Sequence, residues 1–145
     1  MKIATWNVNS LRVRLDHVRD WLKSAEPDVL GLQETKLTDD KFPIAEFEEL
    51  GYHCAFSGQP TYNGVALISR EPATDVVTSL DGFEDPQRRV LGVTVAGVRV
   101  LNLYVPNGQS VDSDKYEYKL GWLTALTAQL RSDLDRYEHV VVMGD

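Results

Sequence analysis

The segment spanning residues 29–36 constrains the fold of this chain more than any other part of the sequence. It opens with an apolar run, Val29–Leu32, that is typical of a buried strand, and four polar residues follow at once. Open α/β folds place their chemistry at the carboxyl ends of such strands. Glu34 is therefore the first candidate for a functional carboxylate, although an ordinary solvated strand end explains the segment better when it is taken alone.

The composition is that of one globular domain. The chain has 145 residues, and 43% of them are apolar, which is enough to build a core. Its formal charge of −7 favours solubility and argues against general binding to nucleic acid or to anionic membranes. A nuclease is still compatible with this charge, because metal-binding carboxylates add acidity and local basic patches can coexist with it.

The cysteine content and the absence of targeting signals predict where the protein is found. The single cysteine, Cys54, cannot form an internal disulfide, which indicates a reducing compartment. Its apolar neighbours make it a packed strand residue rather than a nucleophile. The first seven residues become polar too soon for a signal peptide, and no apolar run reaches membrane-spanning length. We therefore expect a soluble cytoplasmic protein with no membrane partner.

Hydrophobic periodicity predicts about eight or nine strands and three helices. The chain opens with a strand at 2–6, a helix at 11–24 capped by Asn9 or Ser10, and the strand that begins at Val29. The remaining predicted elements are a short helix at 43–50, strands at 52–56, 65–69, 74–78, 90–96 and 98–105, a helix at 113–136 and a strand at 139–143. The core-facing stripe of the long helix is predicted to be Tyr116, Leu120, Leu123, Thr127, Leu130 and Leu134.

The order of these elements predicts the fold class. Helices separate the early strands, whereas short turns join the middle ones, as in the predicted hairpin around Ala96 and Gly97. This mixture favours an α/β sandwich with a mixed sheet over a purely parallel doubly wound fold.

Several predicted strands end in a polar residue that can take part in chemistry. If these strand ends gather on one rim, Asn7, Glu34, Tyr104, Asn107 and Asp145 meet there. Oxygen ligands of this kind suit Mg²⁺, which takes one or two carboxylates and keeps several waters. The rim therefore predicts a magnesium site.

Other kinds of site find little support in the sequence. His17, His53 and His139 are scattered along the chain and are expected to be ordinary helix or strand residues, so no zinc cluster is predicted. The turn after the first strand lacks the glycines of a phosphate loop, and no Ser/His/Asp arrangement is evident.

Five motifs in chain order resemble those of the exonuclease III family, the bacterial apurinic/apyrimidinic (AP) endonuclease branch of the endonuclease/exonuclease/phosphatase superfamily. The resemblance covers the whole chain, with Pro43 and Gln87-Arg88-Arg89 also in familiar places. The motifs are Trp6-Asn7-Val8-Asn9, Leu32-Gln33-Glu34-Thr35-Lys36, Tyr62-Asn63-Gly64-Val65-Ala66, Asn102-Leu103-Tyr104-Val105-Pro106-Asn107-Gly108 and Met143-Gly144-Asp145.

The resemblance implies a DNA-repair phosphodiesterase that depends on Mg²⁺ or Mn²⁺. Such an enzyme cuts duplex DNA 5′ to abasic sites during base excision repair, trims 3′ blocking groups and degrades a strand from its 3′ end. It is expected to be a monomer when full length.

The resemblance also implies roles for individual residues. Glu34 and Asn7 match metal-site residues, Tyr104 matches a tyrosine near the scissile phosphate, and Asp145 matches the aspartate that orients or deprotonates the attacking water. The residues that match substrate-binding positions are Tyr62, Asn63, Gly64, Asn107, Arg88 and Arg89. For the two arginines, a solvated surface position is the alternative.

The sequence departs from the family at Asp145, where it stops inside the Gly-Asp-x-Asn motif. We therefore expect residues 1–145 to be an incomplete domain, the N-terminal half of a four-layer α/β/β/α sandwich. The second sheet is expected to lack most of its strands, so that the inner face of the first is exposed. Such a chain is expected to associate and to have little or no activity alone.

Two alternatives to a DNA nuclease are left open. The first is a non-catalytic half-domain. The second is a superfamily phosphodiesterase that acts on a non-DNA phosphate ester, such as a phosphoinositide or sphingomyelin. Gln33 and Glu34 fit all of these enzymes, whereas Thr35, Lys36 and the segment 104–108 favour DNA.

Overall fold

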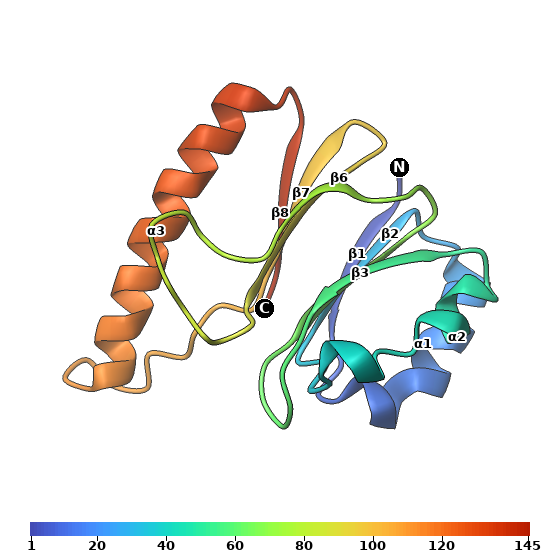
Figure 1. Cartoon of the computed structure of the whole chain (residues 1–145), viewed down its shortest axis with the longest axis horizontal. Coiled ribbons are helices and arrows are strands. Elements are labelled where there is room, and N and C mark those ends of the chain that lie inside the picture. Colours follow the sequence, from blue (N-terminus) through green and yellow to red (C-terminus); the bar gives the residue numbers. More distant parts are fainter.

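The computed structural model describes all 145 residues as four layers in the order α/β/β/α. Two four-stranded sheets lie face to face, α1 and α2 cover the outside of the first sheet, and α3 covers the outside of the second (Figure 1). The predicted fold class, an α/β sandwich with mixed sheets, is confirmed.

The first sheet has the strand order β1-β2-β4-β3, in which β1 and β2 run parallel and the other neighbours run antiparallel. The predicted bounds hold to within one or two residues, and 65–69 is a strand as predicted. The elements of this half are β1 (Ile3–Asn7), α1 (Leu11–Ala25), β2 (Val29–Gln33), a 3₁₀ turn (Asp39–Lys41), α2 (Ile44–Glu48), β3 (His53–Ser57) and β4 (Val65–Ser69).

The second sheet has the order β5-β6-β7-β8, with β7 and β8 parallel. Ala96 and Gly97, both with positive φ, form the tight turn of the predicted β6–β7 hairpin. The elements of this half are β5 (Thr74–Val77), β6 (Val90–Val95), β7 (Val98–Leu103), α3 (Asp114–Arg136) and β8 (Val140–Gly144).

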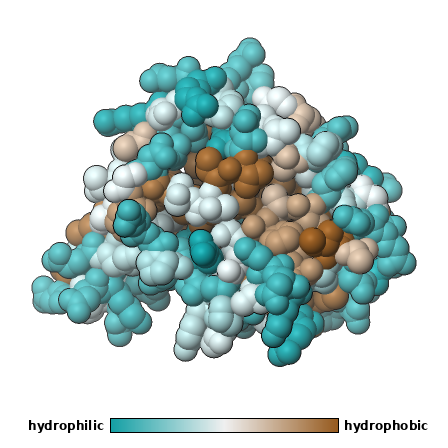
Figure 2. Space-filling model, viewed as in Figure 1, coloured by the Kyte–Doolittle hydropathy of each residue, from teal (hydrophilic) through white to brown (hydrophobic).

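The expectation that the second sheet lacks most of its strands is wrong, because this sheet has as many strands as the first. The expectation of an exposed inner face is wrong for the same reason. Val29, Val65 and Leu67 of the first sheet pack against Leu91 and Val93 of the second in one buried cluster. In the space-filling view, apolar residues gather towards the middle of the molecule, and hydrophilic residues dominate its flanks (Figure 2).

The core-facing stripe predicted for α3 is rotated in the structure. Leu120 and Leu134 are 47% and 65% exposed, whereas Trp122 and Asp133 are buried. Trp122 packs under α3 with Leu101 and neighbouring residues of the second sheet. Burial of this large ring, together with the pairing of Asp133, sets the rotation of the helix.

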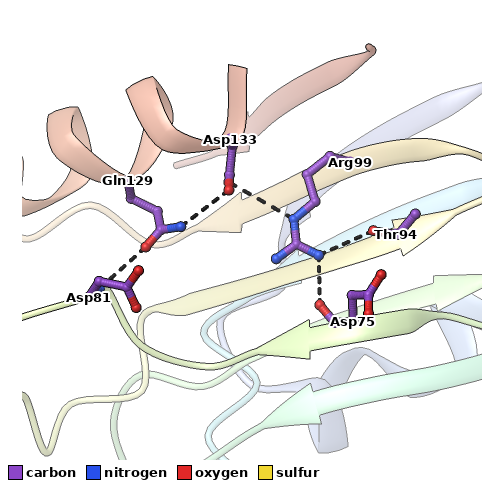
Figure 3. Close-up of polar contacts among 6 residues, drawn as sticks. All are labelled: Asp75, Asp81, Thr94, Arg99, Gln129 and Asp133. Atoms are coloured by element: carbon purple, nitrogen blue, oxygen red, sulfur yellow. Dashed lines mark hydrogen bonds and ion pairs between the residues drawn. The ribbon is translucent and has the colours of Figure 1, made fainter. Parts of the chain in front are cut away.

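Asp133 faces Arg99 of β7 in a buried polar contact (Figure 3). The Asp133 Oδ2 and Arg99 Nε atoms are 3.9 Å apart, and both residues are at most 2% exposed. Arg99 Nη1 also donates to the backbone oxygen of Asp75 at 2.6 Å, and Gln129 Nε2 donates to Asp133 Oδ1 at 3.2 Å. This contact joins α3 to β7 and to β5.

Strands β1 and β3 form the edges of the first sheet, and strands β5 and β8 form those of the second. Thr5 of β1 and Val142 of β8 are exposed there. None of the helices combines the length and the apolarity that crossing a bilayer requires.

Candidate active site

Four strands deliver polar residues to one rim of the molecule. In the parallel pair β1–β2, Asn7 lies opposite Gln33, and Glu34 follows directly. In the parallel pair β7–β8, Leu103 lies opposite Gly144, and Tyr104 and Asp145 follow. Because the members of each pair run in the same direction, their carboxyl ends share one edge.

Two side-chain hydrogen bonds join the sheets at this rim. Asn7 Nδ2 donates to Asp145 Oδ2 at 2.6 Å, and the Tyr104 hydroxyl donates a short hydrogen bond to Glu34 Oε1. In addition, Val105 N donates to the backbone oxygen of Asp145 at 2.7 Å. The structure therefore brings together four of the five rim residues expected from the sequence.

Asn107 is the fifth rim residue, and the structure places it outside this cluster. It is exposed in the loop after β7, and its Oδ1 accepts a hydrogen bond from Gln109 N at 2.8 Å. Asn107 therefore caps its own loop instead of joining the other four residues.

The segment that carries Glu34 has an unusual backbone. Glu34 and Lys36 both have φ of 56°, a left-handed conformation that costs roughly 1–3 kcal/mol for a non-glycine residue. Two backbone hydrogen bonds from neighbouring loops hold this conformation. Ser10 N donates to the backbone oxygen of Glu34 at 2.8 Å, and Lys36 N donates to the backbone oxygen of Asn63 at 3.0 Å. The direction of the Glu34 side chain is therefore determined by contacts with two other loops.

Asn63 and Gly64 support this segment from below. A Cβ on Gly64, whose φ is +94°, would lie 2.2 Å from Thr35 Oγ1, so only glycine fits there. Asn63 is buried, and its Nδ2 donates to Gln59 Oε1 at 3.1 Å. Tyr62, by contrast, is 70% exposed beside them. Of the three predicted substrate-binding residues in this loop, Tyr62 is the one that the structure presents to solvent.

The two arginines at 88 and 89 differ in their surroundings. Arg88 has an exposed side chain with no hydrogen bond or ion pair. Arg89 is half-buried, and its Nε donates to Gln87 Oε1 at 2.7 Å. Its Nη1 donates to the backbone oxygen of Tyr104 at 3.1 Å, and its guanidinium lies 4.8 Å from the centre of the Tyr104 ring. The structure therefore attaches Arg89, but not Arg88, to the rim.

The electrostatics of the rim keep Tyr104 protonated at neutral pH. Burial, the hydrogen bond to Glu34 and the charge of Glu34 raise the pKa of Tyr104 to about 12, against a smaller opposing effect of Arg89. Tyr104 is therefore a hydrogen-bond donor here and not a base.

Sequence reasoning missed a buried amide pair beneath the rim. Gln33 Nε2 donates to Asn102 Oδ1 at 2.6 Å, and Asn102 Nδ2 donates to the backbone oxygens of Leu32 and Ala66 at 3.0 and 2.8 Å. This pair joins β2 to β7 directly below Glu34 and Tyr104. The signal for it was an asparagine inside the otherwise apolar run Leu101–Leu103.

Asn9 and Lys36 form a second contact near the rim that the sequence did not predict. Lys36 Nζ donates to Asn9 Oδ1 at 2.7 Å, and Asn9 N donates to Asn7 Oδ1 at 3.0 Å. These contacts orient the Asn7 amide so that its Nδ2 faces Asp145. Of the two predicted N-cap candidates of α1, Asn9 and Ser10, the structure places Ser10 at the N-cap, without a side-chain capping bond.

The side-chain atoms at the rim that could bind a metal ion are all oxygens. Glu34 and Asp145 supply carboxylates, Asn7 supplies an amide, and nowhere in the structure do three His, Cys, Asp or Glu side chains group as metal ligands. This set fits a hard cation that needs one or two carboxylates and keeps most of its waters, and it does not fit tetrahedral zinc.

Comparisons with known proteins show relatives that match the whole length of the chain. A family profile described as the Endonuclease/Exonuclease/phosphatase family matches residues 4–145. Exodeoxyribonuclease III of Haemophilus influenzae is 32% identical over 154 aligned residues, and the alignment covers all of this chain and 57% of that protein. Exodeoxyribonuclease of Bacillus subtilis is 28% identical, again over the whole chain and 58% of that protein.

Solved structures give the same result. The 3′ phosphatase NExo from Neisseria, bound to a product DNA hairpin, is 51% identical with a TM-score of 0.98 over all of this chain and 57% of its own. An AP endonuclease from Archaeoglobus fulgidus is 46% identical with a TM-score of 0.95 over 56% of its own chain. The chain spans little more than half the length of these proteins, and it belongs to the Endonuclease/Exonuclease/phosphatase family.

Proposed function

We propose that this chain forms part of a metal-dependent DNA-repair phosphodiesterase that acts on abasic sites and on the 3′ ends of duplex DNA. The observation that carries the proposal is the pairing of Glu34 with Tyr104 and of Asn7 with Asp145 across the two sheets at one rim. Relatives that span more than this chain include an exodeoxyribonuclease III, an AP endonuclease and a 3′ phosphatase, the last of them bound to a product DNA hairpin.

Glu34 and Asn7 are the residues that would hold the metal, for which Mg²⁺ is the natural choice and Mn²⁺ a substitute. When bound, such an ion neutralises negative charge that develops on the phosphate oxygens during hydrolysis. Glu34 Oε1 is engaged by Tyr104, whereas its second oxygen makes no hydrogen bond and is free to serve as a ligand.

Tyr104 and Asp145 have different tasks in this site. Tyr104 keeps its proton, because its pKa is raised to about 12, and it donates that proton in a hydrogen bond to Glu34 Oε1, which orients the carboxylate next to the place of the phosphate. Asp145 Oδ2 is held by Asn7, which leaves Oδ1 to orient an attacking water and to accept its proton.

A basic hollow beside the rim supports DNA over a small phosphate ester. It has a volume of about 330 Å³, and Arg12, Lys36 and Lys41 line it together with Ser10 and Thr38. Three cations in one hollow of a chain with a net charge of −7 can bind backbone phosphates away from the cleaved bond.

The cellular location belongs to the same proposal. We expect such an enzyme to work in the reducing cytoplasm, and Cys54, which is a free thiol, is compatible with a reducing compartment. Burial raises the pKa of the Cys54 thiol to about 12, which leaves it unreactive.

Metal binding by the chain itself is the first test. Mn²⁺ titration followed by electron paramagnetic resonance should give a site that is weakened at least tenfold in Glu34→Gln. Glu138→Gln, which removes an exposed carboxylate far from the rim, is the matched control and should bind as the unmodified chain does. Equal binding by both variants would refute the role of Glu34.

Activity is tested in a chimera, because the chain spans only part of its relatives. Residues 1–145 replace the matching segment of the Haemophilus exodeoxyribonuclease III. The folded chimera should cleave an abasic-site duplex and remove a 3′ phosphate only with Mg²⁺ or Mn²⁺, and the Glu34→Gln change should abolish both reactions. A folded chimera without either reaction contradicts the proposal.

A further inference from the structure

We propose that Arg89 is a positioning residue that holds the Tyr104 ring against Glu34, and that it is not a phosphate contact. The inference rests on the proposed function for the catalytic importance of Tyr104. The contacts that carry it belong to the chain alone and can be measured without metal or DNA.

Arg89 contacts Tyr104 through three separate groups. Its guanidinium lies 4.8 Å from the centre of the Tyr104 ring, and its Nη1 donates to the backbone oxygen of Tyr104 at 3.1 Å. The backbone oxygen of Arg89 accepts from Tyr104 N at 2.8 Å. The ring face and both backbone polar groups of Tyr104 are therefore engaged by one residue. The hydroxyl at the far end of the ring is then directed at Glu34.

The position of Arg89 is itself determined by its neighbours. Gln87 Oε1 accepts from Arg89 Nε at 2.7 Å, and the Tyr118 ring of α3 lies 6.0 Å from the guanidinium. Asp85 accepts a short hydrogen bond from the Tyr118 hydroxyl and a second one from Gln87 N at 2.9 Å. Contacts therefore run without a break from α3 through the loop 85–89 to Tyr104.

This environment argues against a phosphate contact at Arg89. Two of its nitrogen atoms already donate within the protein, and one face of its guanidinium covers an aromatic ring. A phosphate would have to compete with all of these partners. Arg88, whose side chain is exposed and has no such partner, is the better candidate of the two for a phosphate.

A lysine could not replace Arg89 in this role. It would keep the positive charge, but it lacks the planar fork that donates in two directions while it stacks on a ring. Comparing Arg89→Lys with Arg89→Met therefore separates geometry from charge.

The test reads the position of the Tyr104 ring by NMR of ¹³C-labelled tyrosine, with the ring signals assigned by their loss in Tyr104→Phe. Nuclear Overhauser contacts between the Tyr104 ring and Glu34 report whether the ring lies against the carboxylate. The measurement is made at neutral pH on the unmodified chain and on each Arg89 variant.

If Arg89 positions Tyr104, the nuclear Overhauser contacts between the Tyr104 ring and Glu34 disappear in both Arg89→Met and Arg89→Lys, because neither side chain keeps the two donors and the stacked face that hold the ring. Arg131→Met, which removes an exposed cation of α3, leaves these contacts unchanged.

Two results would overturn the proposal. Ring–Glu34 contacts that are lost in Arg89→Met but kept in Arg89→Lys mean that Arg89 supplies only charge, and contacts that are kept in both variants mean that it does not hold the ring. Should Arg89→Met fail to fold, Gln87→Met removes only the acceptor of Arg89 Nε, and loss of the ring–Glu34 contacts supports the proposal while unchanged contacts overturn it. This readout does not depend on metal or DNA, so failure of the proposed function is detected separately.

Discussion

The hydroxyl of Tyr104, which follows β7, donates its hydrogen bond to the carboxylate of Glu34, which follows β2 in the opposite sheet. One contact between the two layers thus orients the side chain that is the first candidate for a metal ligand. Residues that orient a metal ligand affect the affinity of the site although they do not touch the ion.

Removal of the Tyr104 hydroxyl should weaken the metal site. In Tyr104→Phe, the Glu34 carboxylate loses its orienting donor, and we expect Mn²⁺ affinity to fall by about tenfold while the fold is kept. Isothermal titration calorimetry measures this loss. Tyr137→Phe, whose hydroxyl makes no hydrogen bond, serves as the control, and an affinity in Tyr104→Phe equal to that control would contradict the orienting role.

The stability of the protein should fall at alkaline pH. The pKa of Tyr104 is raised to about 12, and that of Tyr118 is raised further by burial and by Asp85. Because the unfolded chain releases these protons near pH 10, the folded state binds more protons above that pH, and its free energy of unfolding decreases as the pH rises from about 10 to 12. Below about pH 9 the two phenols should cause no pH dependence.

Urea unfolding at a series of pH values checks this expectation. The midpoint should drop from about pH 10 upwards in the unmodified chain, and the drop should be smaller in Tyr118→Phe. A midpoint that rises with pH in this range has the wrong sign for phenols with raised pKa values and would refute the assignment.

Gly31 is expected to tolerate no side chain. A Cβ at this position would lie 2.5 Å from Met143 Cε and 3.0 Å from Asn102 Cγ. The methionine can move, but Asn102 is held by two backbone oxygens, so Gly31→Ala should lower the free energy of unfolding by about 1–3 kcal/mol. Thermal unfolding compares it with Gly121→Ala on the exposed side of α3, which should stabilise the helix by up to about 1 kcal/mol.

The substitutions of Arg99 and Asp133, which form a buried contact, should be strongly coupled in their effect on the free energy of unfolding (Figure 3). Removing one partner leaves a charge buried, so Arg99→Met or Asp133→Leu alone should cost about 3–5 kcal/mol. The double variant should recover most of that loss, because no unpaired charge is left. Denaturant unfolding of all four proteins measures the coupling, and simple additivity of the two single changes would contradict it.

Association of the chain is expected at the edges of the sheets rather than at their inner faces. Thr5 and Val142 are exposed on the edge strands β1 and β8, and unpaired edges readily add a strand from another molecule. Sedimentation should therefore show self-association that depends on concentration and decreases in Val142→Lys. A chain that stays monomeric at high concentration would contradict this expectation.

Hydrophobic patterning predicted most of the elements because the buried positions of these helices and strands are mostly apolar. It succeeded for β2 and β4, whose residues are buried throughout, and for both ends of α3. It failed for the rotation of α3, since a buried Asp133 has the sequence signature of a solvated residue and reveals itself only through Arg99, far away in the chain.

The same limit applies to the candidate site. Strand ends could be located from the sequence, and four polar residues at those ends do lie together. Arg89 could not be told apart from Arg88, because their difference lies in Gln87, Tyr104 and Tyr118, which only the tertiary structure brings to Arg89. The second sheet has four strands where few were expected, because that expectation followed the position of Asp145 in a motif and not the strands predicted at 74–78, 90–96, 98–105 and 139–143.

The buried amide pair between Gln33 and Asn102 has a mechanical consequence for the whole molecule. Sliding one sheet over the other would leave an amide without partners in an apolar layer, at a cost of about 1–3 kcal/mol for each group. Apolar contacts alone would resist such sliding only weakly, since they have no preferred direction. The relative placement of the layers is thus selected by a hydrogen bond lying just below the rim, where an error of one residue would separate Glu34 from Tyr104.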